Sequence, residues 1–280
     1  MAYTPGKMIL RKEFVWNDSF WTPDGLGADL ALWLDAADAS TVTLNGSNVS
    51  QWNDKSGNGI NLSQATAAFQ PTYVTDLLNG KSGVRSDGSD DKLIAATGFA
   101  AESVMVFMVE RWLEWITNTS KASNLWHTDL PVFGTTNFGM RKEIYNDEMD
   151  TRISDSGNAG TTFLTGQNSA NTLNIANICA SQFNRATSIG NGFFNGNVIA
   201  GETITNIPPS FGGRFSLFVG FGEFANPPRH ANAEIFETVV VSAVLSTADR
   251  QKVEGYLAWK WGLVANLPVS HPYKIKPPVK

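Results

Sequence analysis

One capped helix is expected near the end of a chain that otherwise carries only short strand-like segments. Ser246 and Asp249 supply a capping hydroxyl and an acidic first turn, and Gly262 supplies a left-handed stop. These signals predict a helix over residues 247–262. Apolar residues recur on one stripe of it, so the helix should lie with that stripe against a β-rich body.

Lys260 lies inside this apolar stripe. Lysine stems often run along apolar surface while the ammonium group stays in water. We therefore expect Lys260 to extend toward solvent rather than to take part in chemistry.

The segments before the helix are short, apolar or alternating, and separated by polar turns rich in Gly and Asn. Strands are expected at residues 30–35, 49–54, 83–86, 91–94, 103–109, 150–154, 173–180, 186–194, 215–220 and 233–242. Asn195-Gly196 predicts a type I′ hairpin, because that turn requires two positive φ values. The run 104–109 is apolar throughout and predicts a central strand covered on both faces. The pattern predicts an all-β fold, a two-sheet antiparallel β-sandwich with one C-terminal helix.

Composition narrows the class of protein further. The 280 residues suit one large β domain, and the 42% hydrophobic fraction is typical of a globular chain. A net charge of −5 without a Lys/Arg cluster argues against a nucleic-acid partner. The single Cys179 excludes an intrachain disulfide. Neither a signal-peptide core nor 18 consecutive apolar residues occur, so neither conventional secretion nor membrane insertion is expected.

Residues 1–27 show no clear period and are predicted to form an N-terminal arm, separate from a domain over residues 28–280. Trp16, Phe20 and Trp21 are its candidate assembly contacts. Either the arm packs on its own domain or it inserts into a neighbouring subunit of an assembly. The sequence leaves both alternatives open.

A polar stretch over residues 111–131 carries Trp112, Trp115 and Trp126. Exposed tryptophans stack on sugar rings or anchor protein interfaces, which makes these three the candidate carbohydrate-binding residues. The alternative is a small hydrophobic cluster beneath a long loop.

A series of motifs in matching order resembles concanavalin A-like, or laminin-G-like, jelly-roll modules. They are residues 32–38, 52–59, 70–73, 78–80, 84–93, 194–196 and 233–237, followed by the closing helix with 267–268 and 271–273. The resemblance covers residues 28–273; the arm lies outside it, and residues 111–131 depart from its pattern. Such modules are common in bacteriophage virion proteins and bacterial surface proteins, so the resemblance implies recognition or assembly rather than a fixed chemistry.

Asp87, Asp90 and Asp91 cluster in one short segment and could supply the oxygen ligands that calcium prefers. A polar turn whose side chains bond backbone amides explains the same residues. Calcium is the one cofactor considered.

Glu234 and Glu237 invite comparison with the paired carboxylates of glycoside hydrolases, which lie about 5–5.5 Å apart in retaining enzymes. Residues three apart on a regular strand point to opposite faces, so these two can meet only at a bulge. No catalytic residue is assigned, and the chain is expected not to be an enzyme.

The leading hypothesis is a non-enzymatic bacteriophage virion structural protein: a capsid decoration protein, a tail fibre or a baseplate-associated subunit. It would be made in the cytoplasm of a host bacterium, reside in the virion, and bind other virion proteins or copies of itself. The alternative is a carbohydrate-binding module for a host cell-surface glycan, and the third is a glycan depolymerase.

Overall fold

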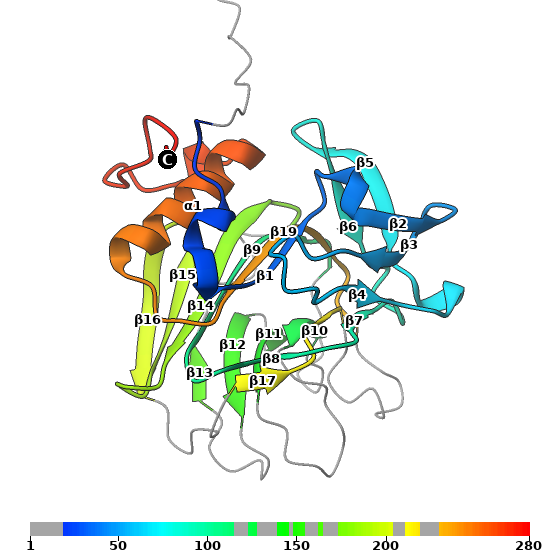
Figure 1. Cartoon of the computed structure of the whole chain (residues 1–280), viewed down its shortest axis with the longest axis horizontal. Helices are drawn as coiled ribbons and strands as arrows, with labels where there is room; N and C mark the ends of the chain where they lie inside the picture. Colours follow the sequence, from blue (N-terminus) through cyan, green and yellow to red (C-terminus); the bar gives the residue numbers. More distant parts are fainter. Residues whose placement is uncertain are drawn as a thin grey trace, which may run out of the picture.

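The computed structural model describes residues 19–114, 123–127, 139–145, 148–154, 162–164, 173–203, 211–218 and 230–280. These residues form antiparallel β-structure closed by one long helix, α1 (Thr247–Trp261), so the predicted fold class is confirmed (Figure 1). Among them, no helix has the length and apolar character that a membrane crossing needs.

The first layer is a six-stranded antiparallel sheet in the order β1-β19-β9-β14-β15-β16. Its strands are β1 (Leu30–Asp35), β9 (Val104–Trp112), β14 (Asn177–Asn184), β15 (Ile189–Phe194), β16 (Asn197–Thr203) and β19 (Ala233–Val241). β9 pairs with β19 on one side and β14 on the other, and residues 104–109 are all buried. The prediction of a central strand covered on both faces is therefore confirmed.

The second layer contains mostly short strands. Its hydrogen-bonded neighbours are, in order, β2 (Val42–Asn45), β3 (Asn48–Trp52), β4 (Leu62–Ser63), β7 (Leu93–Ala95), β18 (Ser216–Leu217), β10 (Ser123–His127), β11 (Gly139–Tyr145), β12 (Glu148–Ser154) and β13 (Thr162–Leu164). β5 (Thr72–Leu78) and β6 (Lys81–Arg85) join this layer to β19. β8 (Phe99–Ala101) and β17 (Phe211–Gly213) form a separate pair. Short 3-10 helices span Pro23–Asp29 (η1), Ala39–Thr41 (η2), Ala67–Phe69 (η3) and Val264–Asn266 (η5).

Two hydrophobic clusters divide the core. Val104, Val106 and Met108 face the cluster that lies between the two layers, together with Trp52 of β3. The alternate residues of β9 join the apolar stripe of α1 in the second cluster. The period of two along β9 thus produces a three-layer arrangement of sheet, sheet and helix.

The local signals at turns and caps are confirmed. Ser246 Oγ accepts a hydrogen bond from Asp249 N at 3.1 Å, and Gly262 ends α1 with a φ of 71°. Asn195 and Gly196 have φ values of 49° and 82° and connect β15 to β16. Each signal involves residues close in sequence, which is why the sequence predicts it.

The first described residues pack on their own domain. Phe20 forms a β-bridge with Val279, and Trp21 N donates to Pro278 O at 3.1 Å. The Trp21 ring is buried with its edge against Tyr256 of α1, at 6.0 Å between centroids. The start of the described chain therefore lies beside its C-terminal end (Figure 1). Trp16 lies outside the described residues.

Candidate functional site

Two of the three candidate sugar-stacking tryptophans are core residues. Trp112 is 2% exposed and Trp126 is 1% exposed, and Trp126 stacks on the ring of Phe215 at 6.1 Å. Neither presents a ring face to solvent, so the interpretation of these two as stacking platforms is wrong. Both lie on strands, β9 and β10, whose pairing buries them. Trp115 lies outside the described residues.

Asp54 folds the loop that follows β3. Its carboxylate accepts hydrogen bonds from the backbone amides of Trp33, Ser56 and Ile60 at 2.8–3.1 Å. The loop over residues 52–59, which resembles the family pattern, is therefore held by its own hydrogen bonds and by one hydrogen bond to Trp33 of β1. One result is that Asn58 Nδ2 reaches the carbonyl oxygens of residues 30 and 31, at 2.7 and 3.1 Å.

This fastening forms one wall of a hollow of about 450 Å³, which we call the β1–β8 hollow. Its lining residues are Ala28, Leu30, Ala31, Asn58, Gly59, Ile60, Thr97, Gly98, Phe99, Ala100 and Ser242. They come from the end of η1, the start of β1, the loop 58–60, the segment 97–98 with the adjoining β8, and the residue after β19. The volume falls within the range of about 300–1,000 Å³ that is usual for small-molecule sites.

The chemistry of the β1–β8 hollow is neutral. No charged residue stands among the described residues that line it. Leu30, Ile60 and the half-buried Phe99 supply apolar surface, while Asn58 and Thr97 supply amide and hydroxyl groups. Such a surface suits an uncharged ligand that has both hydroxyl groups and apolar faces.

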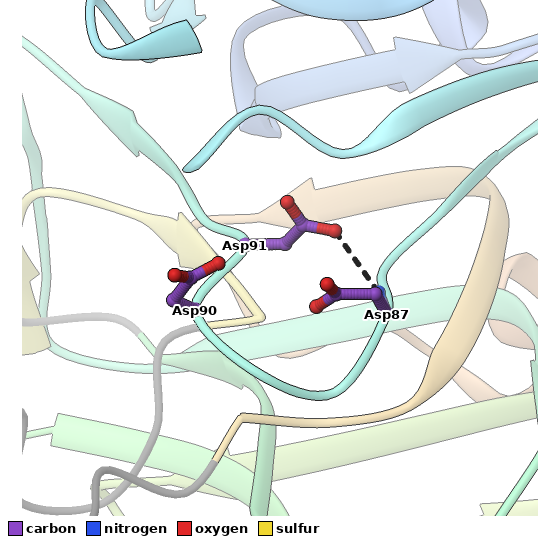
Figure 2. Close-up of side chains that lie close together, drawn as sticks. All are labelled: Asp87, Asp90 and Asp91. Atoms are coloured by element: carbon purple, nitrogen blue, oxygen red, sulfur yellow. Dashed lines mark hydrogen bonds between the residues drawn. The ribbon is translucent and has the colours of Figure 1, made fainter. Parts of the chain in front are cut away.

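The three aspartates of residues 87–91 do converge. Their carboxylate oxygens lie within 4.8 Å of one another, on the turn that leads into β7 (Figure 2). The turn also holds itself: Asp91 Oδ2 accepts from Asp87 N at 2.9 Å, and Asp87 Oδ1 accepts from Ser89 N at 2.7 Å. Carboxylate oxygens fit calcium, although the ion needs six to eight oxygen ligands in all. Calcium binding stays a prediction.

Burial dominates the electrostatics of this turn. It raises the pKa of Asp91 from 3.8 to about 6, and the charges of Asp87 and Asp90 add to the rise. His230 lies against the same residue, with Nδ1 at 3.0 Å from Asp91 O and 2.9 Å from Phe218 O. Burial lowers the pKa of His230, so its ring is neutral at physiological pH.

The two glutamates of β19, Glu234 and Glu237, are buried and paired with cations. A bulge does occur between Ile235 and Glu237. Glu234 is completely buried and pairs with Arg85 at 2.5 Å and with Arg111, whose guanidinium lies over the Phe236 ring. Glu237 is also completely buried. Both carboxylates are completely buried and paired with cations, so neither is accessible to a sugar from solvent.

Glu237 receives four donors from two elements, β1 and α1. Oε1 accepts from Trp33 Nε1 and Tyr256 OH, both at 2.7 Å, and Oε2 accepts from Trp261 Nε1 at 2.6 Å and Lys260 Nζ at 2.7 Å. A carboxylate has about four lone-pair sites, so all are filled.

Lys260 does not extend toward solvent, and that expectation is wrong. Its Nζ also contacts Asp35 Oδ1 at 2.7 Å and Tyr256 OH at 3.1 Å. Burial alone would raise the pKa of Asp35, but the ammonium groups of Lys260 and Lys55 hold it below its usual value. The sequence could not show this, since Asp35 and Glu237 are brought to the helix only by the fold.

Comparison with known proteins supports the fold alone. No protein-family model matches the chain, and no curated protein matches its sequence.

Solved structures resemble it in shape. The receptor-binding domain of botulinum neurotoxin type G is 12% identical, with a TM-score of 0.57 over 83% of this chain and 52% of that one. A botulinum neurotoxin type C structure, a protein that interacts with two ganglioside molecules, is 14% identical, with a TM-score of 0.55 over 84% and 53%. Trypanosoma rangeli sialidase is 13% identical, with a TM-score of 0.55 over 83% and 33%. The chain spans about half the length of the neurotoxin domains. These are β-sandwich binding domains for the most part, so the predicted sandwich is supported.

Proposed function

We propose that this chain is a non-enzymatic module that binds a carbohydrate, and that the β1–β8 hollow holds the sugar. The observation that carries the proposal is the hollow itself, with its mixed apolar and hydroxyl-bearing lining and its volume of about 450 Å³. The likeness to a neurotoxin receptor-binding domain, and to a second neurotoxin that interacts with gangliosides, supports the same class of function.

The lining favours a neutral sugar. A sialic acid or uronic acid carries a carboxylate, which is usually met by a cation or by several hydrogen-bond donors. The described lining supplies no cation. A neutral hexose or N-acetylhexosamine instead offers hydroxyl groups for Asn58 and Thr97 and an apolar ring face for Phe99.

A glycan array with a blocking variant tests the proposal. Ala100 lines the hollow and is exposed, so Ala100→Trp should fill it without disturbing the core. Val269→Trp is the matched control, because Val269 is 92% exposed and lies outside the hollow. We expect wild type and Val269→Trp to bind neutral glycans and Ala100→Trp to lose about tenfold or more in affinity, equivalent to about 1.4 kcal/mol.

Two results would count against this proposal. If wild type binds no glycan on the array, the chain is not a carbohydrate-binding module of the proposed kind. If all three proteins bind equally, the carbohydrate does not bind in the β1–β8 hollow. Release of reducing ends from a bound glycan would instead favour the depolymerase alternative. We expect no such release.

A place in a bacteriophage virion is a second proposal, supported by the resemblance and by the arm's base. Trp21 is buried against α1, and Phe20 forms a β-bridge with Val279, so the first described residues are anchored to the domain. A fixed base suits an arm that docks on another virion protein or on a second copy. The neurotoxin and sialidase structures described above do not bear on this second proposal.

A further inference from the structure

Lys260 is held between two carboxylates from different strands. Its Nζ lies 2.7 Å from Asp35 Oδ1 and 2.7 Å from Glu237 Oε2. The exposed fractions of the three side chains are 11% for Lys260, 6% for Asp35 and 0% for Glu237. The three residues lie on α1, β1 and β19, so this contact forms only in the folded chain.

Burial makes these separate charges costly. Nζ lies 5.4 Å from the ring centroids of both Tyr256 and Trp261, and these cation–π contacts offset part of the cost for the ammonium. Burying an ammonium and a carboxylate costs free energy that their mutual attraction repays only in part. A reaction that turns this ion pair into a neutral amide removes two of the buried charges.

We propose that Asp35 and Lys260 condense into an intramolecular isopeptide bond, with Glu237 as the proton carrier. Nζ attacks Asp35 Cγ, the Nζ–Cγ bond forms, and the Cγ–Oδ1 bond breaks. Glu237 takes two protons from Nζ in turn and passes each to Oδ1, which leaves as water. One ammonium and one carboxylate become one amide and one water, Glu237 ends as it began, and no oxidant or cofactor is consumed.

Lys55 has a place in the same reaction. Its Nζ lies 2.8 Å from Asp35 Oδ2 and 2.8 Å from Asp38 Oδ2. Oδ2 is the oxygen that carries the negative charge of the tetrahedral intermediate and stays as the amide oxygen. A fixed ammonium beside it stabilises that charge as it develops.

Proximity lowers the barrier to this reaction. Condensing free amine and carboxylate in water is unfavourable, but groups held in good geometry react with effective molarities of about 10⁵–10⁸ M. The bond would tie β1 to the last turn of α1 and so restrict the unfolded chain, as a disulfide that closes a long loop does.

Intact-mass spectrometry of the denatured full chain tests this directly. We expect wild type, folded at neutral pH, to be lighter than its sequence by the mass of one water. A tryptic digest should join residues 13–55 to residues 253–274, since trypsin does not cut after an acylated lysine. This mapping separates the cross-link from a cyclised Asp87-Gly88, which also loses water but lies in the peptide 86–92.

Two variants define the roles. Lys260→Arg keeps a cation that can pair with both carboxylates but cannot form the amide, so it should have the full sequence mass. Glu237→Gln keeps both reacting groups without the proton carrier and should stay unlinked or convert at least tenfold more slowly. Wild type at full mass after prolonged incubation in the folded state would overturn the proposal, whatever the variants do. A linked Glu237→Gln at the wild-type rate would overturn the part assigned to Glu237.

Discussion

Asp91 gives the clearest consequence of burial for one titratable group. Its pKa rises from 3.8 to about 6 on folding, because burial and the charges of Asp87 and Asp90 disfavour the carboxylate. The folded chain therefore binds more protons than the unfolded chain between these two pH values. It follows that the free energy of unfolding decreases as the pH rises from about 4 to 6. Above pH 6 the buried Asp91 carboxylate destabilises the folded chain to its full extent.

Replacing Asp91 with Asn should remove this cost. Asp91→Asn is expected to raise the free energy of unfolding by about 1 kcal/mol at pH 7.5 and to leave it nearly unchanged at pH 3.5, with the partly solvated turn screening some of the full effect. Urea unfolding at both pH values measures the difference. Asp29→Asn is the control, because Asp29 is exposed and lies at the end of η1, outside this turn. A gain of equal size at both pH values would show that charge is not the cause.

The same variants test calcium. If the three carboxylates bind the ion, millimolar calcium should raise the melting temperature of wild type at pH 7.5 by mass action, and the rise should disappear in Asp91→Asn. Magnesium serves as the comparison ion. A melting temperature that calcium leaves unchanged would leave these residues as a polar turn held by its own hydrogen bonds.

At the scale of the element, the end of α1 depends on one close approach. Gly262 has a φ of 71°, and a Cβ there would lie 2.6 Å from Asn79 Nδ2, which donates to Trp261 O. Gly262→Ala should therefore lower the free energy of unfolding by about 2 kcal/mol, combining left-handed strain with loss of that hydrogen bond.

The matched control for this variant is Gly46→Ala. Gly46 has a φ of 66°, but nothing lies within 4 Å of its added Cβ. It should lose about 1 kcal/mol, from strain alone. Equal losses in the two variants, measured by urea unfolding, would show that the contact with Asn79 adds nothing.

Elements built from neighbouring residues could be predicted, and contacts between elements could not. The caps of α1 and the Asn195-Gly196 turn depend on a few adjacent residues. The polar neighbours of Trp126 leave open whether its ring is exposed or lies in a hydrophobic cluster beneath a loop, and strand pairing buries it. Lys260 is read as solvated from its place in an amphipathic stripe, but its partners arrive from two distant strands. The hollow is likewise assembled from separate segments, each unremarkable alone.

At the scale of the whole molecule, residues 19–21 of the predicted N-terminal arm pack on the domain. Residues 19–21 hold to the C-terminal end, where Lys280 N donates to Ser19 O at 3.1 Å and Trp21 fills part of the cluster beneath α1. The sequence places the boundary at residue 27, because no period marks where packing begins. Folding and assembly functions of this segment can therefore be separated by where the chain is cut.

A chain that begins at residue 19 should keep the melting temperature of the full protein, because the described contacts are intact. Trp21→Ala should instead lower the free energy of unfolding by about 3 kcal/mol, as expected for a large buried aromatic side chain. In a phage complementation assay, the shortened chain should fold but fail to enter particles if residues 1–18 dock the subunit. Incorporation at the level of the full chain would remove the arm's docking role. A fall in melting temperature on removing residues 1–18 would show that they also stabilise the domain.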